Sequence, residues 1–194
     1  MISFGRFLNL RSGICNLKSK ETQMAIREII KYPHPILKKC CDKVDRIDDE
    51  LWTLIQDMVE TMHSENGIGL AACQVGVPRR IIVLDVSPMD PEKGLFAMIN
   101  PEVVTGEGEV DYEEGCLSLP ECVEKVKRKA KVCVRGCSPE GKEIEVAGEG
   151  ILAIALQHEI DHLDGILILD RISRLKRELY RNKSKKEKRK EETP

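Results

Sequence analysis

Hydrophobic positions recur with a helical period in two parts of the chain. Between about residues 48 and 64 they fall on one helical face, with Asp48 or Asp49 as the N-cap. A second helix is predicted from Gly150 onward, because the apolar stretch that follows contains no helix breaker and Gly165 provides an end signal. The apolar residues on the face of the first helix are Leu51, Trp52, Ile55, Met58, Val59 and Met62.

Shorter apolar runs between these two helices predict strands. Residues 80–86 are typical of a buried strand, and further strands are expected near 95–104, 121–128, 130–136 and 142–147, separated by Gly and Pro turns. A strand-rich middle followed by one long helix indicates an α+β fold. We expect mainly antiparallel β-sheets packed around that helix, with a further helix at the C-terminal end.

Length and composition fit one globular domain with terminal extensions. The chain has 194 residues, of which 41% are hydrophobic and 33% are charged. No apolar run approaches the roughly 20 residues that a membrane-spanning helix needs. We therefore expect a protein with an ordinary hydrophobic core and no membrane partner.

The pentapeptide His158-Glu159-Ile160-Asp161-His162 carries the strongest chemical signal in the chain. Histidines four residues apart lie on the same face of a helix, so both can bind one metal ion. The glutamate between them lies beside that ion and can move a proton from a bound water. The alternative is a helix with two core histidines, which is less expected because the whole chain has only four histidines.

A catalytic metal site of this kind usually has three protein ligands, so a third residue is needed. The extended metalloprotease pattern continues through Gly165 but requires a histidine where this chain has Ile168. The other two histidines, His34 and His63, lie in a proline-flanked turn and at the end of the first helix. Cysteine is therefore the natural candidate for the third ligand.

The eight cysteines favour free thiols over disulfides. The chain is long, has ordinary core residues, and lacks both a CxxC pair and a secretory signal, all of which fit a reducing compartment. Cys133 and Cys137 are typical of small buried hydrophobic residues. Cys116 differs, because Gly115 precedes it and Pro120 ends the segment, which suits a thiolate held on a fixed loop or strand end.

Three segments between residues 67 and 162 together resemble the signature of the peptide deformylase family. They occur in the order that the family shows, and weaker similarity extends from about Met24 to Arg171. The segments are Gly67-Ile68-Gly69-Leu70-Ala71-Ala72-Cys73-Gln74, Glu114-Gly115-Cys116-Leu117-Ser118 and Gln157-His158-Glu159-Ile160-Asp161-His162.

The resemblance implies a metal-dependent hydrolase that removes the N-terminal formyl group from formyl-methionine of newly synthesised polypeptides. It assigns the metal to Cys116, His158 and His162. The ion in this family is typically Fe²⁺ in the cell, with Zn²⁺, Ni²⁺ or Co²⁺ as replacements. Metal-bound hydroxide would attack the formyl carbon, with Glu159 as general base and then general acid.

The resemblance also assigns the groups that would handle the substrate. The Gln74 side chain and the Leu117 backbone N–H would stabilise the oxyanion. The backbone of Ile68 and Gly69 would hydrogen-bond the formyl-methionyl peptide in an extended form. Independently, Ile154 lies on an apolar stripe that leads along the second helix to the first motif histidine, where it either lines a methionine pocket or belongs to the core.

Two other function classes share part of this pattern. A zincin-type protease has the same pentapeptide, but its third ligand is missing because position 168 is isoleucine. A non-catalytic metal-binding module has no use for Glu159 or Gln74, which this chain retains.

The two ends differ in composition from the middle, which divides the chain into 1–23, 24–170 and 171–194. The first segment is an N-terminal leader or extension: residues 1–20 contain arginine and lysine but no acidic residue, as in an organellar transit peptide. We favour a start at Met24 and a cytoplasmic location, with the mitochondrion or a plastid as the alternative. The second segment is the expected catalytic domain.

The third segment is a basic C-terminal helix and tail. Residues 171–192 contain 11 Lys or Arg and 4 Asp or Glu, a net charge of +7 in a chain whose net charge is −2. Ile172, Leu175 and Leu179 indicate an amphipathic helix that grades into a disordered basic end. Such a run is usually a solvated tail. The family resemblance also implies a possible contact with the ribosome, through attraction to its RNA.

Overall fold

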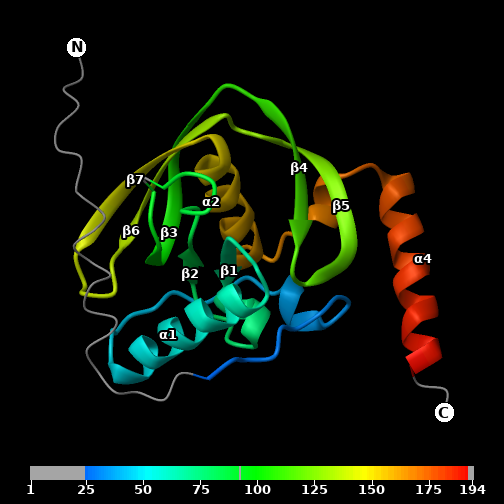
Figure 1. The fold of residues 1–194 in the computed structure, drawn as a ribbon, viewed down its shortest axis with the longest axis horizontal. Coiled ribbons are helices and arrows are strands. Elements are labelled where there is room, and N and C mark those ends of the chain that lie inside the picture. The colour runs from blue at the N-terminus through cyan, green and yellow to red at the C-terminus, as the bar shows by residue number, and fades with distance from the viewer. Residues whose placement is uncertain (1–24, 92, 192–194) are drawn as a thin grey trace.

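The computed structural model describes residues 25–91 and 93–191, and within them helix α2 lies between a five-stranded sheet and a two-stranded hairpin (Figure 1). All the strand pairs are antiparallel, which confirms the predicted α+β class. The predicted leader and the proposed start at Met24 lie outside the described residues. The helices are α1 (Asp49–Ser64), α2 (Gly150–Leu163), α3 (Ile168–Arg171) and α4 (Arg174–Glu191), with the 3₁₀ helices η2 (Pro35–Lys38) and η3 (Ala72–Val75).

The larger sheet has the strand order β1-β2-β3-β6-β7, and β4 pairs with β5 in the hairpin. Five of these strands lie within a few residues of the predicted ranges. The strands are β1 (Gly69–Ala71), β2 (Ile81–Leu84), β3 (Phe96–Glu107), β4 (Val110–Cys116), β5 (Leu119–Arg128), β6 (Lys131–Cys137) and β7 (Glu143–Glu149).

Helix α1 begins where the sequence predicts. The Asp48 carboxylate accepts a hydrogen bond from the Leu51 N–H at 3.0 Å, which satisfies one of the free donors at the helix start. Asp49 and Glu50 place negative charge in the first turn, where the helix dipole favours it. The predicted apolar face packs on the sheet, with Met58 fully buried, except for Trp52, which is half-buried and lies outside this cluster.

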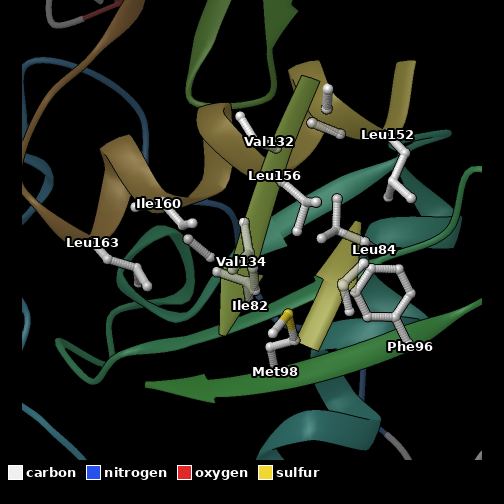
Figure 2. Close-up of a cluster of buried hydrophobic side chains, with 14 of the residues drawn as sticks. Ile82, Leu84, Phe96, Met98, Val132, Val134, Leu152, Leu156, Ile160 and Leu163 are labelled. Atoms are coloured by element: carbon white, nitrogen blue, oxygen red, sulfur yellow. The ribbon is translucent and has the colours of Figure 1, made fainter. Parts of the chain in front are cut away.

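Strand β2 explains why its apolar run is continuous. Ile82 and Leu84 pack in the cluster between the sheet and α2 (Figure 2), whereas Ile81 and Val83 pack in the cluster that includes α1. Successive side chains of a strand point to opposite faces. Because helices cover both faces of this strand, both sets of positions are apolar.

Helix α2 presents different residues to the two sides. Leu152, Leu156 and Ile160 recur every four residues and point onto the sheet in Figure 2. His158 and His162 are each offset by two residues from this stripe, which is roughly half a turn at 3.6 residues per turn. Packing of the apolar stripe on the sheet therefore directs both histidines toward the β4–β5 hairpin.

The chain turns sharply where α2 ends. Gly165 has a φ of +70°, and a Cβ there would lie 2.8 Å from the carbonyl carbon of Lys38. Glycine is therefore required twice at this position, by its backbone conformation and by the close approach of η2. This agrees with the end signal that the sequence provides.

The sequence patterns do not predict β1 or β4. Strand β1 has only three residues, which is too short for a recognisable pattern. Strand β4 is mostly exposed, and of its seven residues only Glu114 is buried. A strand without a buried apolar face shows no alternation of apolar and polar residues, so a pattern search misses it.

Helix α4 confirms the predicted C-terminal helix, but its apolar residues do not pack as an amphipathic helix would. The side chains of Leu175 and Leu179 are 70% and 62% exposed. A different face docks on the hairpin, where Tyr180 Oη donates to the Pro120 carbonyl at 3.1 Å. The helix also continues to Glu191, into the stretch where the sequence favours a disordered end. None of the helices within the described ranges is long and apolar enough to cross a membrane.

Candidate metal and catalytic site

Three potential metal ligands from two separate elements meet beside α2. His158 and His162 lie one turn apart on α2, with ring centroids 5.0 Å apart. Cys116 ends strand β4, and its Sγ lies 3.2 Å from His162 Nε2. One possible donor atom from each of the three residues lies within 4.8 Å of the other two. The fold thus brings together residues that are 42 to 46 positions apart in the chain.

This donor set suits a divalent transition metal. Zinc and iron-group ions favour thiolate and imidazole ligands, whereas hard cations such as Mg²⁺ favour oxygen ligands. Three protein ligands are also the usual number where a metal keeps one position for water or substrate.

A buried network of charges holds the first histidine from behind. His158 Nδ1 lies 2.7 Å from Glu114 Oε2, which leaves Nε2 as the nitrogen that can bind an ion. Glu114 also accepts hydrogen bonds from Arg128 Nε at 2.7 Å and from Arg128 Nη2 at 2.9 Å. The third guanidinium nitrogen, Nη1, lies 2.5 Å from Asp161, which also pairs with Arg171.

The charge state of this network follows from its pairing. Burial alone favours the neutral form of Glu114, but hydrogen bonds from Arg128 and His158 lower the pKa of Glu114 below its ordinary value. No sequence pattern predicts a role for Arg128, and Glu114 and Asp161 stand out in the sequence only as members of motifs. The contacts of Arg128 with Glu114 of β4 and Asp161 of α2 become visible only in the folded structure.

Glu159 lies between the two histidines and lines the pocket beside them. It is 4% exposed, and its Oε2 has no hydrogen-bond partner among the described residues. Burial raises the pKa of Glu159 to about 7. A buried polar atom without a partner requires an explanation, and here a bound ion, water or substrate supplies one.

Gln74 lies beside Cys116, and hydrogen bonds fix the orientation of its side-chain amide. Its Oε1 accepts a hydrogen bond from the Ala71 N–H at 2.8 Å, so Nε2 faces Ser118 Oγ at 3.2 Å and Cys116 Sγ at 3.9 Å. Leu117 follows Cys116 in the turn between β4 and β5. Its backbone N–H takes part in no hydrogen bond among the described residues. Both predicted oxyanion donors are therefore close to the cysteine ligand.

A pocket of about 500 Å³ opens onto Cys116, His158 and Glu159. Its lining includes each predicted substrate-binding residue: Ile68 and Gly69 at the start of β1, and Ile154 on α2. The apolar stripe of α2 contributes Ile151 and Ala155 as well as Ile154. Strand β1 is at the edge of its sheet, so one side of it is open to a further strand.

The remaining histidines lie elsewhere. His34 Nδ1 accepts from the Ile36 N–H at 3.2 Å and so caps η2, while His63 Nε2 lies 2.9 Å from Asp85 Oδ2. The cysteines in the described part of the chain are free thiols, as the sequence favours. Among them, Cys122 also lines the pocket without belonging to the group of metal donors.

Comparison with known proteins places the chain among deformylases. Residues 26–178 match the family model for polypeptide deformylase. A peptide deformylase of Thermodesulfovibrio yellowstonii is 55% identical over 165 residues, which are 85% of this chain and 100% of that protein.

Solved structures agree with the sequence comparison. The crystal structure of a peptide deformylase from Legionella pneumophila aligns with a TM-score of 0.80 at 44% identity, and the match covers 88% of this chain and 99% of that one. A class I type b peptide deformylase from Acinetobacter baumannii, in a structure with Met-Ala-Ser bound, aligns with a TM-score of 0.71 at 32% identity. That match covers 76% of this chain and 99% of the other.

Proposed function

Because the chain belongs to the polypeptide deformylase family, an enzyme family whose members remove the N-terminal formyl group, we propose that it acts through the Cys116–His158–His162 site. Its substrates are newly synthesised polypeptides that begin with formyl-methionine. The reaction is hydrolysis of the formyl amide, and the products are formate and a free amino terminus.

Cys116, His158 and His162 would hold one divalent metal ion. We propose Fe²⁺ in the cell, with Zn²⁺, Ni²⁺ or Co²⁺ as replacements, because the mixed sulfur and nitrogen donors suit these ions. When bound, the metal acts as a Lewis acid that lowers the pKa of water and polarises the formyl oxygen. The hydrogen bond between His158 and Glu114 orients the first imidazole for this role.

Glu159 moves the protons. Its unpartnered Oε2 takes a proton from the attacking water and returns it to the amine nitrogen as the carbon–nitrogen bond breaks. A pKa that burial raises toward neutrality suits a group that must both accept and donate a proton near pH 7.

Negative charge develops on the formyl oxygen as water adds to the carbon. Gln74 Nε2 and the Leu117 N–H are the two donors that would stabilise it. The Ala71 N–H holds the Gln74 amide in the orientation that presents Nε2, so this donor is already in place before the substrate binds. Donors fixed in advance reduce the reorganisation that the transition state would otherwise require.

The peptide would lie between β1 and the end of β4. The backbone of Ile68 and Gly69 pairs with it as an added strand, which binds nascent chains with little dependence on their sequence. On the other side, a Cβ at Gly115 would come no closer than 3.9 Å to any protein atom. Packing therefore does not require glycine at 115, but glycine leaves room for a peptide backbone. The methionine side chain packs on Ile151 and Ile154.

The observation that carries this proposal is the convergence of one thiol, two imidazoles and an unpartnered carboxylate oxygen at one pocket. A zincin-type protease would need its third ligand after α2, but Ile168 lies there and is buried in the core. A metal-binding module without catalysis would give Glu159 no function.

The test is anaerobic purification with metal analysis, followed by an assay of formate release from formyl-Met-Ala-Ser. An unformylated peptide cleaved at an internal bond serves as the protease control. We expect release of formate and no internal cleavage. Glu159→Ala should keep the metal and lose about two to four orders of magnitude in rate. Near-normal turnover of metal-loaded Glu159→Ala would refute the mechanism.

Two cysteine variants test the metal site. Cys116→Ser should lose the metal, whereas Cys122→Ser, which changes a buried thiol of the same pocket, should retain it. With Fe²⁺ bound, activity should also decay in air and be preserved by a reductant, because a thiolate ligand is oxidisable. Equal metal content in Cys116→Ser and the unmodified protein would exclude Cys116 as a ligand.

The wider setting follows as a proposal from the same function. Residues 24–170 would form the catalytic domain and act in the cytoplasm, or in the mitochondrion or a plastid if residues 1–23 serve as a transit peptide. The basic segment 171–194 would bring the enzyme to the ribosome, where formylated chains emerge.

A further inference from the structure

The turn that carries the proposed oxyanion donor is held from outside the hairpin. Cys116 pairs with Leu119, so Leu117 and Ser118 form a two-residue turn whose carbonyl groups lie outside the strand ladder. The Leu117 carbonyl accepts a hydrogen bond from Lys31 Nζ at 2.8 Å. The Ser118 carbonyl accepts one from the Tyr32 N–H at 2.9 Å. Both partners belong to the extended segment 30–32 near the N-terminus.

The same segment also holds the second oxyanion donor. The Ile30 N–H donates to the Gln74 carbonyl at 2.8 Å. The Gln74 side chain in turn donates to Ser118 Oγ at 3.2 Å. Segment 30–32 therefore connects the two residues whose N–H groups would face the formyl oxygen, although they come from η3 and from the β4–β5 turn.

Of the side chains that take part in these hydrogen bonds, that of Lys31 is the charged one. Its ammonium group takes part in no ion pair among the described residues, so the Leu117 carbonyl is the protein partner that the structure gives it. A hydrogen bond from an ammonium to a carbonyl is shorter and stronger than one between neutral groups. It restrains the peptide plane that follows Leu117, while the pairing of Cys116 with Leu119 restrains the chain before it, so Leu117 and its N–H are held from both sides.

We propose that Lys31 is a positioning residue for the oxyanion-binding groups, acting through the Leu117 carbonyl. This inference rests on the proposed function. Lys31 touches neither the metal donors nor the substrate pocket, and its effect is to keep the Leu117 N–H directed at the formyl oxygen. A group that acts on transition-state stabilisation changes kcat, whereas one that acts on substrate affinity changes KM.

The test compares Lys31→Met with Lys31→Arg on metal-loaded enzyme. Methionine keeps an unbranched side chain but cannot donate a hydrogen bond, while arginine keeps both the charge and the donors. For formyl-Met-Ala-Ser we expect Lys31→Met to lower kcat about tenfold, less than the loss of an oxyanion donor itself. KM, metal content and melting temperature should stay near those of the unmodified enzyme. Lys31→Arg should recover most of the activity.

Lys39→Met is the matched control, since Lys39 is an exposed lysine of the same N-terminal region with no side-chain contact to the turn. It should behave as the unmodified enzyme. Combining Lys31→Met with Gln74→Ala should lower kcat by less than the product of the separate effects, because both changes act on one oxyanion.

Three results would overturn the inference: kcat of Lys31→Met within twofold of the unmodified enzyme, a loss confined to KM, or a loss that tracks lower metal content or melting temperature and is not recovered by arginine. If the unmodified, metal-loaded enzyme fails to release formate, the proposed function falls together with this inference. An active enzyme with an unaffected Lys31→Met variant overturns the inference alone.

Discussion

The Glu159 side chain fits in its observed position because residue 69 is glycine. A Cβ on Gly69 would lie 2.9 Å from Glu159 Cδ and 3.0 Å from its Cγ, both too close for van der Waals contact. The Glu159 side chain is buried, so it has little room to move aside. Gly69 therefore makes room for the proposed acid–base group and also belongs to the proposed substrate-binding edge.

We expect Gly69→Ala to displace the Glu159 carboxyl and to lower kcat by at least about tenfold, since small displacements of reacting groups are costly. Metal content should be unchanged, because the three donors lie on other elements. The measurement is steady-state kinetics on formyl-Met-Ala-Ser with metal analysis of the same samples. Gly94→Ala is the control, since a Cβ at Gly94 would meet no atom within 4 Å. Equal kcat for both variants would contradict this role of Gly69.

The pH dependence of the reaction should reflect the protonation of Glu159. Burial raises the pKa of Glu159 to about 7, and a bound cation acts in the opposite direction by favouring the carboxylate. Only the deprotonated form accepts a proton, so activity is lost as pH falls through this pKa. We expect an acid limb of kcat/KM between the ordinary glutamate pKa of about 4.3 and pH 7.

The measurement is a pH profile of kcat/KM with a redox-inert metal, with metal content checked at each pH so that ligand protonation is not mistaken for Glu159. A profile that stays flat throughout this window, with the metal retained, would show that no group with a raised pKa limits the reaction.

At the scale of elements, α2 and the hairpin β4–β5 are joined through one arginine. Arg128, which is 3% exposed, connects Glu114 on β4 with Asp161 on α2. Cys116 lies two residues beyond Glu114, and His162 directly follows Asp161. This ion network therefore sets the distance between the two elements that supply the metal donors.

Replacing Arg128 by methionine should remove the bidentate partner of the buried Glu114 and one of the two arginine partners of Asp161. Removal of one member of a buried ion pair costs about 3 to 5 kcal/mol, so we expect a large fall in the free energy of unfolding measured in urea. Metal affinity should fall as well, because Glu114, the partner of His158, would no longer be held in place by Arg128. Arg135→Met is the control, since Arg135 pairs with Glu145 on the exposed face of the sheet. An equal loss of unfolding free energy in the two variants would contradict a greater contribution from the buried ion network.

The elements also show what sequence patterns can predict. Helix α1, strand β2 and helix α2 each have a buried face, and burial is what makes a periodic pattern visible. The convergence of Cys116, His158 and His162 was predictable because these candidate metal donors lie in short motifs. Arg128 was not, because its partners come from another strand and a helix, and their proximity depends on how the hairpin packs against α2 rather than on local sequence.

Helix α4 shows the limit of the same reasoning. Its apolar residues Leu175 and Leu179 have helical spacing, which predicts a packed face. In the structure the packed face is formed by Tyr180, by Lys176 paired with Glu124 and by Lys183. The hairpin presents Glu121 and Glu124 to α4, and these carboxylates pair with a basic face that the apolar pattern cannot identify.

On the scale of the whole molecule, the charge is divided between a basic C-terminal segment and an acidic remainder. Part of the positive charge of α4 is paired within the molecule, through Lys176 and Lys183. Residues 185–194 lie beyond these contacts and contain five more Lys or Arg. The outward face of α4 exposes Leu175 and Leu179. The proposed catalysis and the proposed contact with the ribosome would therefore reside in separate parts of the chain.

Truncation after Ser184 should separate the two. It keeps the contacts of Tyr180 and Lys183 with the hairpin, so deformylation of formyl-Met-Ala-Ser should stay within about twofold of the full chain, since surface changes away from a site have small effects. If the tail binds ribosomal RNA, co-sedimentation with ribosomes should weaken, and the residual binding should depend less steeply on salt, because fewer counterions are released. Ribosome binding by the full chain that does not respond to salt, or that survives truncation unchanged, would leave the tail without this role. A full-length variant with Leu175 and Leu179 replaced by serine tests separately whether the exposed apolar face contributes to that binding.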